Sequence, residues 1–378
     1  MQFAGVSHRF PTTVVGSLPR PAWLLDRWEE QRDPQVIERR RLDYLPEWYR
    51  TERPAERPRP LTPDERARVL DQAVPFAIAM QETAGIDLVS DGEWRRPHFH
   101  DFIARRIAGF KPLTVQGYYS AVVAPLEVTE SLTADEARFL LAGSSHKVKI
   151  ALPSPYLMAR RMYHPTESAR AYPTREAFMA ALVPILRREL ETLRDLGVAL
   201  VQFDDPAIGV LVDRAKRQDF ADPDRELAVA VDYLNQVVDG VSGVATALHV
   251  CRAVGLRSWS NEGGYEPILA GLYRARVDLL MLEFAMPVAG DVEIFARFPT
   301  ERTIGLGCVD IRSETIEGPG LVVQRVEQAL RYLHPDQLVL NPDCGFAPSS
   351  MLPIPLDEAY FKLRALGLAA DRLRQQHG

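Results

Sequence analysis

Cysteine is scarce in this chain, with three residues in 378. Three cysteines do not make the disulfide framework of a secreted protein, so we expect a reducing, cytoplasmic location and a separate reason for each cysteine. No apolar run reaches the roughly 20 residues that span a bilayer. Residues 1–10 also lack the charged-then-apolar layout of a signal peptide. The net charge of −6 argues against a nucleic-acid surface, which needs clustered positive charge. We therefore expect neither a membrane nor a nucleic acid as partner.

A regular alternation of apolar runs and helical patterns dominates the rest of the chain. We expect eight strands, at residues 12–17, 86–90, 148–152, 199–204, 244–249, 277–283, 303–308 and 337–341. The main helices are expected at 64–84, 174–196, 224–238, 265–274, 291–297, 320–333 and 356–366. Strands that are apolar on both faces and alternate with helices indicate a buried parallel sheet. Eight such units predict a single (β/α)8 TIM barrel over residues 1–378. A doubly wound open sheet is the alternative, although no Gly-rich phosphate fingerprint follows the first strand.

Two additions to the barrel are expected. Residues 23–50 are rich in Arg, Glu and Trp and predict an N-terminal helical extension, followed by a stiff connector crowded with prolines up to Pro63. Thr62 and Pro63 have the residue types of an N-cap and a first helical position. Residues 99–145 are irregular and predict an insertion after the second strand, with a hairpin near 115–128.

Polar residues with chemical potential stand directly after the predicted strands. In a barrel those positions share one rim, where active sites of this fold are found. Residues of this kind are Ser17, Asp91, Glu93, Asp204, Asp205, His249, Cys251, Glu283, Cys308, Asp310, Asp343 and Cys344.

Four of these residues are candidate zinc ligands. His249 and Cys251 are two apart at the end of a strand, so both side chains can point the same way. With Glu283 and Cys344 they offer one imidazole, two thiolates and one carboxylate, a set that suits zinc. An exchangeable position on the metal would hold an incoming thiol as its nucleophilic thiolate.

Each ligand also has a plainer interpretation when taken alone. His249 and Cys251 would be a hydrogen-bonded core pair, Glu283 a rim residue, and Cys344 a small core residue. Their joint placement at three strand ends favours the metal. Two further alternatives stay open: a barrel hydrolase in which zinc activates water, which two thiolate ligands disfavour, and a purely structural zinc site or ordinary core.

The acids near the rim have two interpretations. Asp204, before Asp205 and Pro206, is either a strand-to-loop turn or an anchor for a substrate ammonium group. Glu93 is either part of a solvated turn or an acidic anchor in the barrel mouth, with Arg95 and Arg96 available to pair with it or with a substrate carboxylate.

Seven motifs together resemble the catalytic domain of cobalamin-independent methionine synthases, especially their short single-barrel relatives. They are Thr13-Val14-Val15-Gly16-Ser17-Leu18-Pro19-Arg20, Ser90-Asp91-Gly92-Glu93, Gln202-Phe203-Asp204-Asp205-Pro206-Ala207, His249-Val250-Cys251, Leu282-Glu283, Gly305-Leu306-Gly307-Cys308-Val309-Asp310 and Asn341-Pro342-Asp343-Cys344-Gly345.

The resemblance implies a zinc-dependent transfer of a methyl group to a small thiol, homocysteine. By motif it implies zinc ligands at His249, Cys251, Glu283 and Cys344. It further implies that Glu93 and Asp204 hold the homocysteine amino group and that Ser17 contacts the amino-acid end.

Three departures from the long form of the family limit what the resemblance implies. We expect no counterpart here of the N-terminal half that helps to bind folate in the long form. The long form has a proton-donating His where this chain has Arg312, and we take Asp310 in the same triplet as the candidate catalytic residue. Because arginine is a poor general acid, methylcobalamin or a corrinoid protein is considered as donor beside methyltetrahydrofolate. A short insertion with Trp259 and Tyr265 is expected to reshape the substrate mouth.

Overall fold

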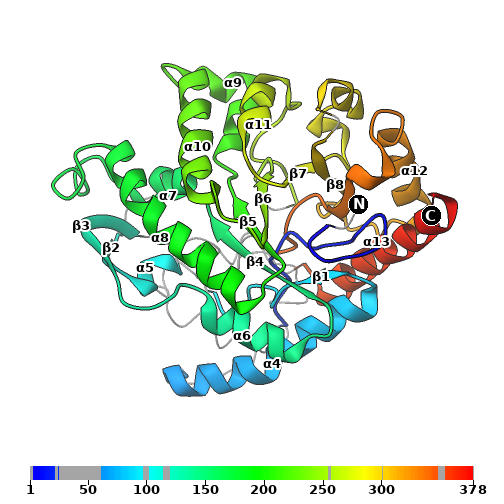
Figure 1. The fold of residues 1–378 in the computed structure, drawn as a ribbon, viewed down its shortest axis with the longest axis horizontal. Coiled ribbons are helices and arrows are strands. Elements are labelled where there is room, and N and C mark those ends of the chain that lie inside the picture. Colours follow the sequence, from blue (N-terminus) through cyan, green and yellow to red (C-terminus); the bar gives the residue numbers. More distant parts are fainter. Residues whose placement is uncertain are drawn as a thin grey trace, which may run out of the picture.

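The centre of the structure is a sheet of seven parallel strands in the order β1-β4-β5-β6-β7-β8-β9 (Figure 1). The structure is a computed structural model that describes residues 3–21, 24, 61–96, 102–113, 120–253, 257–299, 301–347 and 354–377. The strands are β1 (Leu88–Val89), β4 (Lys147–Pro153), β5 (Leu200–Asp204), β6 (Ala245–Val250), β7 (Leu279–Glu283), β8 (Thr303–Val309) and β9 (Leu338–Pro342). Each pairs in parallel with its neighbour in this order, which confirms the buried parallel sheet.

Helices connect the strands and cover the outer face of the sheet (Figure 1). The longer ones are α4 (Pro63–Ala84), α6 (Ala134–Gly143), α7 (Pro155–Met162), α8 (Arg175–Leu196), α10 (Pro223–Val238), α12 (Pro319–Ala329) and α13 (Leu356–His377). Short helical turns are α5 (Ile103–Arg106), η2 (Ile208–Val212), α9 (Arg214–Arg217), η3 (Glu266–Ile268), α11 (Leu269–Arg274), η4 (Pro287–Ala289), η5 (Val292–Arg297) and η6 (Pro335–Gln337).

The sheet is curled around a small apolar cluster. Side chains from both edge strands, β1 and β9, meet side chains from the middle of the sheet and from the N-terminal segment. A flat sheet keeps its two edges apart, so this shared cluster requires the sheet to curve. The cluster consists of Val6, Val15, Leu88, Leu200, Ala247, Leu279, Met281 and Val339.

The N-terminal segment lies between the two edge strands but does not form the strand that we expected at 12–17. Thr12 bridges Leu340 of β9 and Thr13 bridges Leu88 of β1, each as a single parallel pair. The next two carbonyl oxygens in the segment accept hydrogen bonds from side chains. Lys149 Nζ donates to Val14 O and Val15 O, and Gln202 Nε2 donates to Val15 O at 2.9 Å. Those carbonyls therefore accept from side chains instead of from a neighbouring strand, and seven strands are found where eight were predicted.

The first long helix begins where the sequence indicated. Thr62 Oγ1 accepts from Glu65 N and the Glu65 carboxylate accepts from Thr62 N, which makes a complete capping box. After β1, the predicted insertion contains an antiparallel hairpin of β2 (Ile107–Pro112) and β3 (Ser120–Val128). The expected N-terminal helices at 23–50 and most of the proline connector lie outside the described residues.

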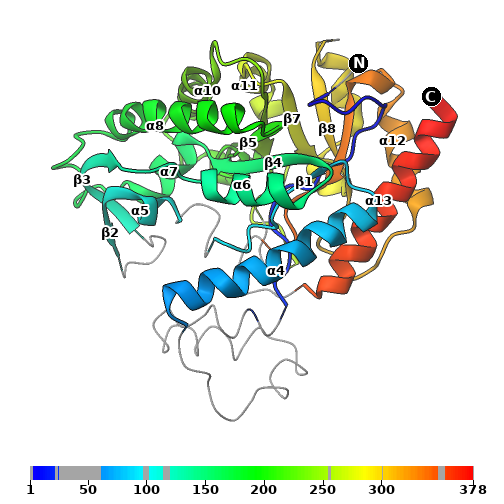
Figure 2. The same cartoon turned by 60° about the horizontal axis from the view of Figure 1, so that its bottom comes forward.

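The last helix is longer than predicted because Gly367 does not end it. Helix α13 continues to His377 and runs beside α4 (Figure 2). A Cβ at Gly367 would overlap the carbonyl oxygen of Ala84 and lie 3.1 Å from Gly85 Cα. The glycine thus permits the two helices to approach closely. At its far end α13 meets the N-terminal segment, where the rings of Phe10 and His377 are 5.8 Å apart.

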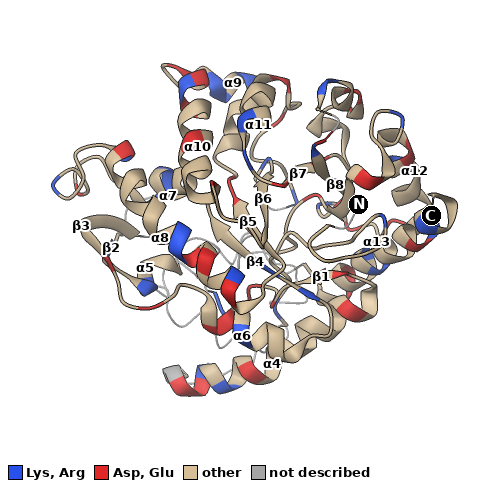
Figure 3. Ribbon diagram, viewed as in Figure 1, with Lys and Arg blue, Asp and Glu red and all other residues tan. Residues whose placement is uncertain are grey.

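Acidic and basic residues are interspersed along the outer helices (Figure 3). Within the described part of the chain, no helix combines the length and the apolar character that a bilayer crossing requires.

Candidate metal centre

His249, Cys251 and Cys344 come together at the carboxyl ends of β6 and β9. Their candidate ligand atoms lie within 4.8 Å of one another, and all three residues are buried. His249 is near the end of β6, Cys251 directly follows that strand, and Cys344 is two residues past β9. Strands β6 and β9 are not neighbours in the sheet, so the group depends on its curvature.

His249 has one ring nitrogen available for a metal. Its Nδ1 lies 3.2 Å from the carbonyl oxygen of Met281 on β7. Its Nε2 is buried and has no hydrogen-bond partner among the described residues. Burial acts to lower the pKa of His249, but Cys251, Asp204 and Glu283 outweigh it and raise the pKa. A buried, unpartnered imidazole nitrogen beside two thiols is the arrangement that a bound zinc ion would satisfy.

The two thiols shift each other's pKa in opposite directions. The Cys344 thiol, followed by His249, lowers the pKa of Cys251 well below its usual value. The pKa of Cys344 is raised in turn by Cys251 and by burial. Cys251 is therefore the more acidic thiol of the pair. The third cysteine, Cys308, lies outside this group. Its thiol is 3.7 Å from the carbonyl oxygen of Asn341, and burial raises its pKa.

Glu283 reaches the same region but is held by two arginines. Its Oε1 accepts from Arg312 Nη2 at 2.7 Å and its Oε2 from the backbone N–H of Arg252 at 2.9 Å. It is not among the three residues whose ligand atoms cluster. Arg312 is also 3.8 Å from Asp343 and has its guanidinium 5.4 Å from the Trp259 ring centroid.

The segment between Cys251 and Glu283 fixes the two strand ends. The Tyr265 hydroxyl donates to Val250 O at 2.9 Å and accepts from Glu283 N at 2.8 Å. Arg252 stacks on the Tyr265 ring at 3.8 Å, and its guanidinium donates twice to Gly263 O. Tyr265 thus links the end of β6 to the end of β7.

Two buried carboxylates, Glu93 and Asp204, lie near this group. Burial raises the pKa of Glu93 to about 7, with Arg96 opposing the rise and Asp204 and Asp91 adding to it. Burial also raises the pKa of Asp204, which accepts from Gln202 Nε2 at 2.5 Å. Glu93 has a left-handed φ of 59°, a strained conformation for a residue with a side chain. Such strain is typical of functional sites.

Lys149 lies beside the carboxylates of Glu93 and Asp204, which we call the acidic corner. We did not predict it as a site residue. It is fully buried on β4. Burial lowers its pKa to about 7, against the opposite pull of Asp204 and Glu93. The sequence does contain a signal for this part of the site, because Lys149 and Gln202 are polar residues within otherwise apolar strands. Arg252 was also missed as a site residue, because nothing local shows that it stacks on Tyr265.

Ser17 and Asp310 each lie on a loop. Ser17 lies against the loop after Cys344, since its Oγ accepts from Ala347 N at 3.3 Å and its carbonyl from Phe346 N at 2.9 Å. The Asp310 carboxylate accepts the backbone N–H groups of Arg312 at 2.8 Å and Ser313 at 3.2 Å. It therefore shapes the loop that carries Arg312.

These features define an α/β protein with a candidate His–Cys–Cys metal centre at the carboxyl ends of a curled parallel sheet. The family model described as the catalytic domain of cobalamin-independent synthase matches residues 49–355. The chain belongs to this family.

Relatives and solved structures agree with the assignment. The methionine synthase of Thermococcus kodakarensis is 29% identical over 347 residues, covering 89% of this chain and 86% of that protein. The methionine synthase of Pyrococcus horikoshii is 29% identical over 374 residues, with 97% and 93% covered. A B12-independent methionine synthase from Shewanella sp. W3-18-1, solved with selenomethionine, has a TM-score of 0.74 at 25% identity, with 97% and 98% covered. The family's cobalamin-independent description gives no support to the corrinoid donor that we considered.

Proposed function

We propose that this chain is a zinc-dependent methyltransferase that methylates the thiol of homocysteine to give methionine. The observation that carries the proposal is the buried group of His249, Cys251 and Cys344, with an unpartnered His249 Nε2, in a chain of this family. The curl of the seven-stranded sheet, with isolated bridges from Thr12 and Thr13 to its two edge strands, also supports our proposal of one (β/α)8 barrel domain.

His249, Cys251 and Cys344 would hold the zinc ion, with Glu283 as the fourth ligand. Zinc bound there favours the thiolate form of an incoming thiol. Glu283 can contribute a remaining lone pair while Arg312 and the Arg252 N–H keep its carboxylate in place. In this proposal two thiols, one imidazole and an oriented carboxylate would surround the position where a thiol substrate would react.

Glu93 and Asp204 would bind the ammonium group of homocysteine. Burial raises the pKa of both carboxyl groups, and the charge of Asp204 raises that of Glu93 further. Such a pair gains from a cation between its members, because the cation offsets both charges. Ser17, beside the Cys344 loop, would contact the amino-acid end. These three residues would orient the substrate so that its thiol faces Cys251 and Cys344.

The donor that the family description favours is a methylated folate. In the transfer the thiolate sulfur would form a bond to the methyl carbon and the N–CH3 bond would break with its electron pair left on nitrogen. That nitrogen would take up one proton, which balances the proton that the thiol released when it became a thiolate. Arg312 stays protonated and is ion-paired to Glu283, so it does not supply that proton. Asp310, which holds the Arg312 loop, is our candidate for the catalytic carboxylate.

Zinc content and methyl transfer test the proposal. The purified protein should contain about one zinc per chain, and Cys344→Ser should lower zinc affinity strongly because it removes one ligand. Cys308→Ser is the matched control, because Cys308 is equally buried but lies outside the group. Zinc binding that is the same in Cys344→Ser and the wild type would refute the metal assignment.

The substrates are tested by offering homocysteine with methyltetrahydrofolate and, separately, with methylcobalamin. We expect transfer from the folate, and a weakened affinity for homocysteine in Asp204→Asn. An unchanged homocysteine affinity in that variant would refute the ammonium anchor. Transfer from methylcobalamin alone would refute the folate donor.

A further inference from the structure

Two loops beside the acidic corner are joined by buried hydrogen bonds. Residues 16–20 make up the first loop, and residues 90–96, which follow β1, make up the second. Three hydrogen bonds connect them: Ser90 Oγ to Gly16 O at 3.1 Å, Leu18 N to Gly92 O at 2.9 Å, and Trp94 Nε1 to Leu18 O at 3.2 Å. The loop that carries Ser17 and the loop that carries Glu93 are therefore fixed to each other.

The backbone of Glu93 is held on both sides in its left-handed conformation. Its N–H donates to Asp91 Oδ1 at 2.7 Å. Its carbonyl oxygen accepts from Arg20 Nη2 at 2.6 Å and from Arg96 N at 3.1 Å. A backbone conformation of this kind is unfavourable by itself and persists only where the surrounding contacts over-determine it. We call Asp91, Arg20 and Arg96 the Glu93 clamp.

Arg20 is the member of the clamp that reaches Glu93 from the other loop. Its side chain is buried, and its Nη2 donates to the carbonyl oxygens of both Glu93 and Arg96. A guanidinium suits this role because each terminal nitrogen carries two N–H groups in one plane, so one nitrogen can serve two acceptors. Arg20 therefore fixes the spacing of the two carbonyl groups as well as their distance from the first loop.

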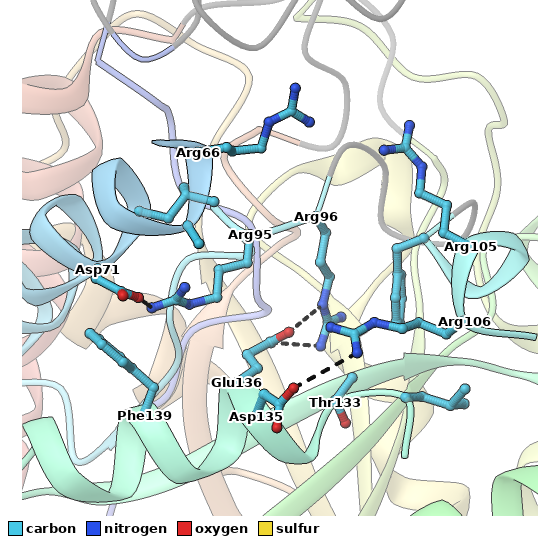
Figure 4. Close-up of a pocket in the computed structure, with 14 residues that line it drawn as sticks. Arg66, Asp71, Arg95, Arg96, Arg105, Arg106, Thr133, Asp135, Glu136 and Phe139 are labelled. Atoms are coloured by element: carbon cyan, nitrogen blue, oxygen red, sulfur yellow. Dashed lines mark hydrogen bonds and ion pairs between the residues drawn. The ribbon is translucent and has the colours of Figure 1, made fainter. Parts of the chain in front are cut away.

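Arg96 attaches the clamp to a helix and a strand. Its Nε and Nη2 donate to the Glu136 carboxylate on α6 at 3.0 and 2.7 Å, in the wall of a cavity of about 550 Å³ (Figure 4). Its Nη1 donates to Ala151 O on β4 at 2.6 Å, and its guanidinium lies 4.5 Å from the Phe102 ring centroid. The loop that carries Glu93 is thus tied to two regular elements.

The conformation that the clamp imposes places the Glu93 carboxylate against Gly16. A Cβ on Gly16 would lie 2.2 Å from Glu93 Oε1, which is far shorter than a van der Waals contact. The glycine therefore leaves the space that this carboxylate oxygen occupies. The position of the carboxylate depends on two features, the clamp on the backbone of Glu93 and the absence of a side chain at Gly16.

We propose that Arg20 is a positioning residue that makes the acidic corner selective for thiols with an ammonium group, an inference that rests on the proposed function. Arg20 acts through Glu93, whose carboxylate would bind the ammonium. A hydrogen bond between charged groups is strong only in good geometry, so a displaced carboxylate loses most of its value as an anchor. The thiol end of the substrate is bound elsewhere, at the candidate metal centre, and does not depend on the clamp.

The experiment compares, by calorimetry, the affinities of the zinc-loaded whole chain for homocysteine and for 4-mercaptobutanoate, which lacks only the amino group. Wild type should bind homocysteine about tenfold or more tightly, because the analogue leaves the buried carboxylates without a cation. In Arg20→Met this preference should fall to about threefold or less, while the affinity for 4-mercaptobutanoate stays within about twofold.

Arg302→Met is the matched control. Arg302 also donates to two backbone carbonyls, those of Ala275 and Val277, but it lies directly before β8 at the opposite end of the strands. This variant should keep the full preference for homocysteine. Circular dichroism and the melting temperature verify that each variant is folded.

Two more variants separate the position of Glu93 from the charge beside it. Gly16→Ala leaves every charge in place but displaces the Glu93 carboxylate, so it should lower the preference as Arg20→Met does. Arg20→Lys keeps the positive charge on a shorter side chain and should recover less than half of the lost preference. Full preference in either variant would refute the positioning role, because the carboxylate position would then not matter or the charge alone would suffice.

The outcomes also separate this inference from the proposed function. Equal wild-type affinity for the two thiols would refute the ammonium anchor and, with it, the role of Arg20. A preference that Arg20→Met retains, or an equal loss of affinity for both thiols, would refute the positioning role and leave the proposed reaction intact. A preference that depends on Arg20, without methyl transfer to homocysteine, would support the positioning role and refute the proposed reaction.

Discussion

The ion pair between Arg312 and Glu283 offers a direct test of how the candidate centre is held together. Both side chains are buried, with exposed fractions of 3% and 1%, and Arg312 Nη2 is 2.7 Å from Glu283 Oε1. The replacement Arg312→Met keeps much of the volume but leaves Glu283 without its nearest cation. Arg252 remains, with its backbone N–H at 2.9 Å and its Nη1 at 3.8 Å.

Removing one partner of a buried pair lowers stability by about 3–5 kcal/mol, because the other charge stays buried. The Arg252 contacts place the expected loss for Arg312→Met near the lower end, at roughly 3 kcal/mol. Replacing both partners by uncharged residues is often close to neutral. The double variant Arg312→Met/Glu283→Gln should therefore regain at least half of the loss.

Urea unfolding in the presence of a metal chelator measures these differences without a contribution from zinc. Arg138→Met is the matched control, since its ion pair with Asp135 is exposed and should contribute about 0–1 kcal/mol. If the double variant were as unstable as the sum of the two single variants, the two side chains would not be coupled, and our reasoning about the centre would be wrong.

Three further predictions concern single residues, two beside the candidate centre and one between two helices. The raised pKa of Glu93, about 7 against an ordinary 4.5, adds stability that is full below 4.5 and is lost as pH rises through about 7. The pKa difference corresponds to roughly 3 kcal/mol of unfolding free energy. In Glu93→Gln the unfolding free energy, measured without ligand, should therefore fall less steeply between these two pH values. A slope equal to that of the wild type would contradict the raised pKa of Glu93. Gly367→Ala should destabilise by about 1–3 kcal/mol because its Cβ overlaps Ala84 O, whereas Gly320→Ala in α12, with open space around it, should stabilise by up to about 1 kcal/mol. Thermal melts of the two variants should therefore shift in opposite directions. Tyr265→Phe removes the hydroxyl between Val250 and Glu283 and should destabilise by about 1–3 kcal/mol while weakening zinc binding; zinc affinity equal to that of the wild type would show that Tyr265 does not position the site.

The sequence by itself determined the alternation of strands and helices and most of their positions. This was possible because those elements depend on local signals: apolar runs of strand length, the capping box at Thr62, and the Gly197 that ends α8. It also determined which strand ends carry reactive side chains. His249 and Cys251 were found because the two-residue period of a strand is visible in the sequence.

Only the tertiary structure decided how distant side chains pair. Lys149 takes the carbonyls that a strand at 12–17 would have used, and Gly367 continues a helix because it packs against the end of α4. Arg312 holds Glu283, so one of the four predicted ligands is also an ion-pair partner. Local patterns specify the order of strand ends along the chain. The curvature of the sheet and the burial of charges, which depend on contacts between distant residues, decide which ends meet.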